Sequence, residues 1–171
     1  MENKQTTGKI ALTYGLIGGL ISIAFNVMIW SMDMLYDQNP VTGVIGFLIM
    51  AGVVIAGIIV YKKANGGFIT LKEALKVGTG TALIVGVLSV LYTLVLVNVL
   101  EPDFAMKNAE TTCQVMIEQN PTISDEQLDM IADNSINYFW ITYPSILIFS
   151  AFIGFIISLI VGLIVKKAKP E

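Results

Sequence analysis

The sequence predicts an all-α membrane protein with four transmembrane helices and a small helical hairpin in the outer loop between spans three and four. Three observations lead to this fold class. Apolar residues make up 55% and charged residues 13% of the 171 residues, whereas about 25% of an ordinary soluble domain is charged. Four uncharged runs, at 10–32, 38–61, 77–100 and 134–165, are each long enough to cross the hydrocarbon core. Finally, nine of the ten lysines lie in the two tails or in the connection between spans two and three.

The distribution of the ten lysines predicts the orientation of the chain. The connections after the first and third spans carry one lysine, Lys107, and ten carboxylates. The other nine lie in the two tails or in the connection between spans two and three: Lys4, Lys9, Lys62, Lys63, Lys72, Lys76, Lys166, Lys167 and Lys169. Short lysine-rich segments stay in the cytoplasm. We therefore expect a multi-pass protein with both termini in the cytoplasm.

The first span is expected at 10–32. Gly15 and Gly19 form a G-x-x-x-G pair, which lets two membrane helices approach closely. The pair fits either a dimerisation face or packing inside one bundle, and we favour packing because three other helices are available. Trp30 and Tyr36, near the outer end, are typical of the membrane interface.

The second and third spans are expected at 41–61 and 77–100. An Asn-Pro pair at 39–40 is a turn signal and marks where the second helix can start. Thr70 and Glu73 have the spacing of a capping box, which predicts a helix that begins before the hydrocarbon. The third span then carries three small residues four apart, which are Gly78, Ala82 and Gly86.

The polar segment 101–137 is expected to form two short helices on the outer face. Ser124 and Gln127 are spaced as a capping box at the start of the second helix. Cys113, the only cysteine, lies on an apolar stripe of the first helix, so we favour a packed thiol over one that pairs between chains. Three carboxylates four apart resemble ligands for a hard cation, but a straight helix cannot wrap an ion, and we favour a solvated acidic face: Asp125, Asp129 and Asp133.

The fourth span is expected at 143–165, and the bundle is expected to be organised around it. Four small residues spaced four apart form one smooth ridge along this span: Ser150, Gly154, Ser158 and Gly162. The polar helix that starts after Ser124 is expected to run directly into this span. A bend is expected at Pro144, because a proline inside a helix removes a hydrogen bond.

The four spans contain no aspartate, glutamate, lysine or arginine. Ion-coupled carriers keep such residues in the membrane, so this composition argues against a secondary active transporter. The polar candidates inside the spans are Asn26 and Asn98, which we expect to meet and hydrogen-bond across helices. With no histidine and no nucleophile, phosphate-loop or metal-ligand pattern, we predict no catalytic, cofactor-binding or metal site.

Two short motifs resemble those of a known family. Residues 67–74 (GFITLKEA) lead into the third span, and Asn98 is followed by residues 102–104 (PDF) at the start of the acidic segment. Together with the four spans, these motifs resemble family 4199 of the domains of unknown function, which are small bacterial integral membrane proteins. The resemblance implies a four-helix architecture and a bacterial inner membrane, and it implies no catalytic residue.

These features predict a non-enzymatic membrane protein that acts by helix association, with itself or with a larger membrane complex. The alternative is a small channel or transporter for an uncharged or weakly polar solute, lined by Asn26, Asn98 and the intramembrane threonines. The expected partners are the lipid bilayer and a membrane protein chain, either a second copy or another protein, and not nucleic acid.

Overall fold

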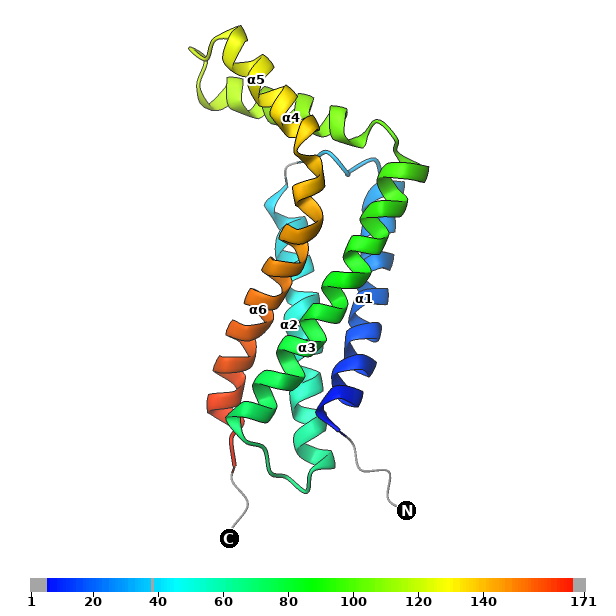
Figure 1. Ribbon diagram of the computed structural model, residues 1–171, viewed down its shortest axis with the longest axis vertical. Helices are drawn as coiled ribbons and strands as arrows, with labels where there is room; N and C mark the ends of the chain where they lie inside the picture. The colour runs from blue at the N-terminus through cyan, green and yellow to red at the C-terminus, as the bar shows by residue number, and fades with distance from the viewer. Residues whose placement is uncertain (1–5, 38, 168–171) are drawn as a thin grey trace.

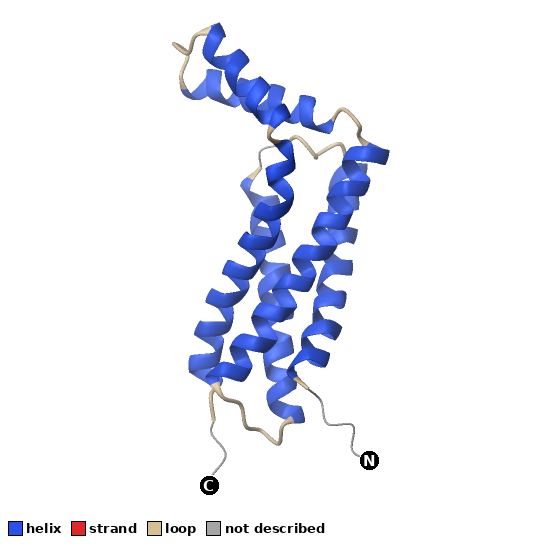
Figure 2. Ribbon diagram, in the orientation of Figure 1, coloured by secondary structure: helices blue, strands red, loops and turns tan. Residues whose placement is uncertain are grey.

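The computed structural model describes residues 6–37 and 39–167, which form helices joined by short connections (Figure 1; Figure 2). The α-helices are α1 (Thr7–Ser31), α2 (Pro40–Ala64), α3 (Leu71–Val95), α4 (Phe104–Gln119), α5 (Asp125–Asn137) and α6 (Thr142–Val165). A π-helical turn, Leu96–Leu100, continues α3, and a 3₁₀ turn, Phe139–Ile141, precedes α6. These ranges contain no β-strand, only one isolated bridge. The all-α fold class is confirmed.

Four helical segments are long and apolar enough to cross a membrane: Thr7–Ser31, Pro40–Ala64, Leu71–Leu100 and Phe139–Val165. A helix of 25 residues, the length of the first two, extends about 37 Å. That length exceeds the roughly 30 Å of a hydrocarbon core. The first and third segments begin ahead of their uncharged runs, at Thr7 and Leu71, because the polar residues before those runs are already helical. The second and fourth begin inside their runs, at Pro40 and Phe139.

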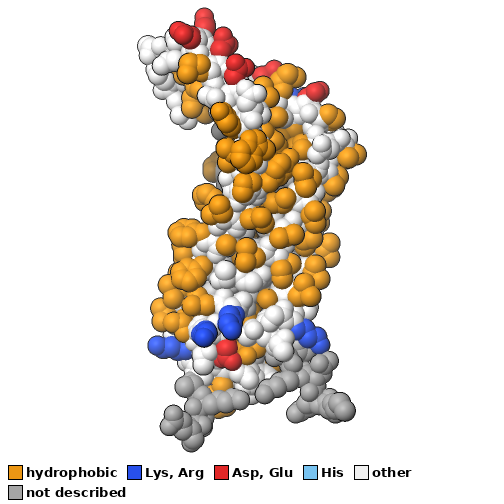
Figure 3. Space-filling view, in the orientation of Figure 1, with side chains coloured by type: hydrophobic (Ala, Val, Ile, Leu, Met, Phe, Trp, Pro, Cys, Tyr) orange, Lys and Arg blue, Asp and Glu red, His pale blue; other side chains and the backbone are white. Residues whose placement is uncertain are grey.

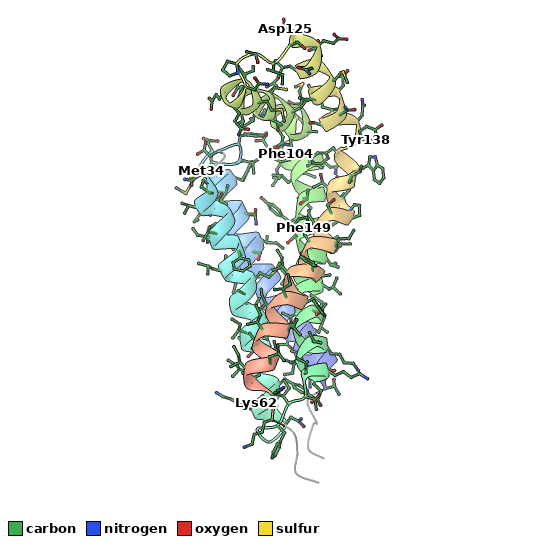
Figure 4. All side chains as sticks on the ribbon, turned by 90° about the vertical axis from the view of Figure 1, so that its left-hand side faces the viewer. Met34, Lys62, Phe104, Asp125, Tyr138 and Phe149 are labelled. Carbon is green, nitrogen blue, oxygen red and sulfur yellow. The ribbon has the colours of Figure 1, made fainter. Side chains whose placement is uncertain are left out.

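The four long helices form a bundle with the chain ends at one end and the α4–α5 hairpin at the other (Figure 1). We call these the terminal end and the hairpin end. α2 and α3 each contact the other three long helices. The helices lie close together at the terminal end and diverge toward the hairpin end in two views at right angles (Figure 1; Figure 4).

Charge is separated along the bundle axis. On the face that Figure 3 shows, acidic side chains gather on the hairpin, hydrophobic side chains cover the middle of the bundle, and lysines lie at the terminal end beside an acidic group. Lys62 and Lys63 lie in the last turn of α2, where cations complement the helix dipole. Lys4 and Lys169, which also entered the orientation argument, lie outside the described residues.

Both predicted capping boxes are confirmed. Glu73 N donates to Thr70 Oγ1 (3.2 Å), and Thr70 N donates to Glu73 Oε2 (2.8 Å). Ser124 and Gln127 make the same reciprocal pair, each bond being 3.3 Å. The first box starts α3 at Leu71, ahead of the apolar run, because it satisfies N–H groups that have no partner inside the helix.

The connection at the terminal end is closed by two glycines and a backbone bridge. Gly66 and Gly67 have φ values of 71° and 85°, a left-handed region that glycine adopts without a steric cost. Beyond them, Ile69 N donates to Lys167 O (3.0 Å) and Lys167 N donates to Ile69 O (2.9 Å). Ile69 is only 1% exposed. The bridge therefore holds the residues after α6 against the start of α3.

The predicted continuous helix from Ser124 into the last span is wrong. α5 ends at Asn137, the chain turns through Phe139–Ile141, and α6 begins at Thr142. Pro144 is consequently in the first turn of α6, where the missing N–H would have no intrahelical partner. The proline therefore marks a helix start, and no hydrogen bond is lost to a bend.

Candidate ligand cavity

The small residues of α3 and α6 face one another across their interface. Four pairs are stacked at four-residue intervals: Ala74 with Gly162, Gly78 with Ser158, Ala82 with Gly154, and Gly86 with Ser150. Each glycine lies so close to its partner that an added Cβ atom would overlap it. Ser158 is fully buried, and its Oγ donates to Gly154 O. The close approach of the two helices depends on one member of each pair lacking a side chain.

Gly15 and Gly19 are packed in the same way against α3. A Cβ atom on Gly15 would lie 2.5 Å from Ile84 Cβ, and one on Gly19 would overlap Leu88. All nine small residues singled out from the sequence are buried between the helices of this one chain. Their ridges are therefore occupied inside the bundle.

The glycines near the start of α2 have a different environment. A Cβ atom on Gly43, Gly46 or Gly52 would meet nothing within 4 Å among the described residues. Gly57, further along the same helix, instead faces Tyr14 and Thr81. The first half of α2 thus presents small residues outward, away from its own bundle.

Asn26 and Asn98 do not meet. Asn26 Nδ2 donates to Ser22 O (2.8 Å), and Asn98 Nδ2 donates to Leu94 O (2.7 Å), so each amide bonds its own helix. The expected cross-helix hydrogen bond is not among those formed by the described residues. Asn98 lies in the π-helical turn, whose wider coil rotates it relative to a regular α-helix, and it is exposed.

At the hairpin end, a partly open cavity of about 400 Å³ lies between α1, α3 and α6. This volume is within the range of small-molecule sites, about 300–1,000 Å³. Uncharged residues make up the whole described lining, and five of them are polar: Asn26, Ser89, Tyr92, Thr93 and Thr142. The cavity therefore offers hydrogen-bonding groups inside the apolar band of the bundle.

The hydroxyl of Tyr92 is the unusual group in this cavity. It is buried and has no hydrogen-bond partner among the described residues. Leaving a buried polar group unpaired costs about 1–3 kcal/mol, so such groups call for an explanation. Ser89 Oγ donates to Val85 O (3.0 Å) and Thr93 Oγ1 donates to Ser89 O (2.9 Å). Their oxygens can still accept, so the cavity combines one free donor with hydroxyl acceptors.

Sequence reasoning placed Asn26 and the threonines among the polar groups of the membrane and overlooked Tyr92 and Thr142. A signal was available for Tyr92, because Ser89, Tyr92 and Thr93 are spaced at i, i+3 and i+4 and so share one helix face. Thr142 carried no such signal. Thr142 lines the cavity because α6 begins there, whereas the sequence predicted one longer helix that continued through this position.

A row of aromatic rings covers the cavity at the hairpin end. Ring centroids are separated by 5.8 Å from Tyr36 to Phe104, 5.7 Å from Phe104 to Phe139, and 6.1 Å from Phe139 to Tyr143. Phe104 and Phe139 also line the cavity itself. The row connects the loop after α1, the start of α4 and the start of α6. The two edge-to-face contacts that Phe139 makes stabilise it beyond simple burial.

Glu101 joins the base of the hairpin to α1. Its carboxylate accepts from Trp30 Nε1 (3.3 Å) and from Lys107 Nζ (2.9 Å). These two hydrogen bonds, that from Lys107 first, hold the pKa of Glu101 below its usual range. The hydrogen bond that Lys107 donates to Glu101 also raises the pKa of Lys107, whose ammonium lies 5.7 Å from the centre of the Tyr36 ring. At neutral pH the Glu101 carboxylate is therefore ionised, and it links the base of the hairpin to α1.

The hairpin offers little beyond packing at the residues singled out from the sequence. Cys113 is half-buried, and its Sγ donates to Leu128 O (3.6 Å) across the α4–α5 contact. Three carboxylates four apart on α5 are exposed, namely Asp125, Asp129 and Asp133. In the part of the chain that the structure describes, no three histidine, cysteine or acidic residues are grouped closely enough to hold a metal ion.

Four long apolar helices, small residues at their contacts and lysines gathered at one end define a multi-pass membrane protein. Residues 13–167 match the family described as protein of unknown function (DUF4199), and the chain belongs to this family. The comparisons with curated proteins and with solved structures gave no match.

Proposed function

We propose that this protein is a non-enzymatic membrane protein that binds a small uncharged molecule in the hairpin-end cavity. The observation that carries the proposal is Tyr92, which lines the cavity and whose buried hydroxyl has no partner among the described residues. A ligand oxygen that accepts from this hydroxyl would remove its desolvation cost. Because the described lining is uncharged, a charged ligand would lose its hydration without compensation.

The packing of the terminal half supports binding from one side rather than an open pore. A buried apolar cluster fills the bundle there and includes Val54, Ile58, Val77 and Ile157. Val54, Ile58 and Val77 are completely inaccessible to solvent. A solute in the cavity would meet this cluster before it reached the terminal end, so passage would require the bundle to rearrange.

The proposed orientation puts the termini in the cytoplasm of a bacterial cell and the cavity in the outer half of the inner membrane. It is supported by the lysines at the terminal end and the acidic hairpin (Figure 3).

We expect a membrane-impermeant maleimide to label Cys113, the only cysteine, in cells with a permeable outer membrane and an intact inner membrane. Cys113→Ser is the control. Labelling that requires lysis of the inner membrane would reverse the orientation.

A second candidate function is association with another copy or with a membrane complex. The observation that favours it is the outward face of α2, where Gly43, Gly46 and Gly52 leave open space that a helix could approach. The ridges on the other three long helices do not support it, because they are occupied inside the bundle.

Native mass spectrometry of gently extracted protein tests the two candidates together. We expect an 18.6 kDa chain that retains a small molecule, and Tyr92→Phe should weaken its affinity about tenfold, the value of one hydrogen bond. Tyr92→Phe should also unfold at a higher temperature without ligand, because no hydroxyl is left unpaired. Asn98→Leu, which lies outside the cavity, is the matched control. Whole multiples of the chain mass with no adduct would favour association and contradict the cavity.

A further inference from the structure

A second hollow lies on the other side of the cavity wall. It is a groove of about 680 Å³ between the hairpin and the first turns of α6. The groove and the cavity share four lining residues, which are Phe104, Phe139, Thr142 and Ile146. The cavity and the groove therefore adjoin one another across these side chains.

The groove runs from the level of the lipid headgroups into the level of the acyl chains. Tyr138 and Trp140, 57% and 60% exposed, mark the interface at the start of α6. Phe149, further along α6 toward the middle of the bundle (Figure 4), is 67% exposed, at the level where we expect the acyl chains. The lining changes in the same direction, from Asn134 and Ser135 on α5 to Ile146 and Phe149 on α6.

We propose that the ligand reaches the cavity sideways from the bilayer through this groove, and that it is a single-chain amphiphile with an uncharged, hydroxyl-bearing head. This inference rests on the proposed function and names its ligand class and its route. The head occupies the cavity, and the chain lies in the groove along α6. The route crosses the shared wall when the Phe104 and Phe139 rings turn aside.

The donors and acceptors define the head. Tyr92 supplies a free donor, and the hydroxyl oxygens of Ser89 and Thr93 supply acceptors. A hydroxyl group both accepts and donates, so it satisfies both kinds of partner. No charged side chain lines the cavity or the groove in the described chain, which disfavours a phosphate, carboxylate or ammonium head.

The surroundings of the cavity favour the lipid side over the aqueous side. On the hairpin side, Leu35, Phe104 and Phe139 narrow the cavity, and the hydrogen bond from Trp30 to Glu101 holds the base of the hairpin to α1. Toward the terminal end, the buried apolar cluster blocks the path. The shared wall borders the groove directly, so it is the shortest connection to the outside.

The test uses the full chain in lipid nanodiscs and two photoactivatable probes that carry a diazirine. One is an analogue of 1-octanol, short enough to lie in the cavity alone. The other is a monoacylglycerol with a long chain. We expect both to label cavity peptides of α3 saturably, and a fatty acid of the same chain to label about tenfold less. An excess of free glycerol should not displace the monoacylglycerol, because the chain supplies most of its binding.

Ser145 lines the groove but not the cavity, so Ser145→Trp blocks the chain and leaves the head site intact. This variant should lose monoacylglycerol labelling about tenfold and keep octanol labelling. Ile148→Trp, on the 69% exposed lipid face of the same helix, should change neither. Octanol labelling without monoacylglycerol labelling, or monoacylglycerol labelling that survives Ser145→Trp, would overturn the lateral route and spare the proposed function. Absence of labelling by both probes would overturn the two together.

Discussion

Gly154→Ala is expected to destabilise the bundle by about 3 kcal/mol, the upper end of the usual cost of overpacking a core. An added Cβ atom would overlap Ala82 Cβ, which is joined directly to the α3 backbone and cannot rotate away. The two helices must therefore separate, and the neighbouring small-residue pairs would loosen with them. Unfolding in mixed micelles, followed by circular dichroism, measures the loss.

The structure also specifies a rescue. Ala82→Gly removes the atom that the added methyl group would strike, and the remaining neighbours of the new Cβ atom lie at 3.4 and 3.5 Å, ordinary contact distances. The double variant should recover most of the lost stability, with a coupling energy of about 2 kcal/mol. Gly52→Ala, with nothing within 4 Å, is the control and should be neutral or slightly stabilising. A tolerated Gly154→Ala would show that α3 and α6 are not in close contact.

Ser89→Phe is expected to abolish saturable labelling of the cavity by the octanol probe. Ser89 lines the cavity, so a phenyl ring at this position would fill the space that the proposed ligand needs. The ring enters a void rather than a packed core, and the melting temperature should fall by less than about 3 °C. Labelling followed by peptide mass spectrometry measures the first effect, and thermal unfolding measures the second.

Val87→Phe is the matched control for this experiment, since Val87 is two positions away on α3 and 48% exposed on its outer face. It adds the same ring outside the cavity and should leave labelling unchanged. Full labelling of Ser89→Phe would mean that the probe binds elsewhere, and the cavity would lose its proposed role. Loss of labelling in both variants would indicate a general change in the membrane-embedded protein.

Much of the fold follows from local patterns. Uncharged runs predict the four spans, because the bilayer requires about 20 apolar residues per helix. The capping boxes at Thr70 and Ser124 were also predictable, since each depends on side chains three residues apart. Pro144 was misread because the pattern does not distinguish a bend inside a helix from a first turn. That choice depends on whether α5 folds back on α4.

The candidate site was predictable only in part. Small residues at four-residue spacing predict a close helix contact but not its partner, and both a second chain and a neighbouring helix satisfied the pattern. Asn26 was recognised as polar, yet its expected partner Asn98 is turned away by a π-helical turn. Tyr92 was overlooked, and only the cavity beside it sets its hydroxyl apart.

Composition and local order predict four helices that are long and apolar enough to cross a membrane, because the transfer of apolar and charged groups between water and lipid depends on little else. They also predict the capped starts of α3 and α5 and which helix faces are smooth. The packing of the helices, by contrast, is what joins α3 and α6 as small-residue pairs while the bundle diverges at the hairpin end. A cavity is lined by surfaces from several helices, and it forms only where those surfaces fail to fill the space between them. The lack of a partner for the Tyr92 hydroxyl likewise depends on how the helices pack.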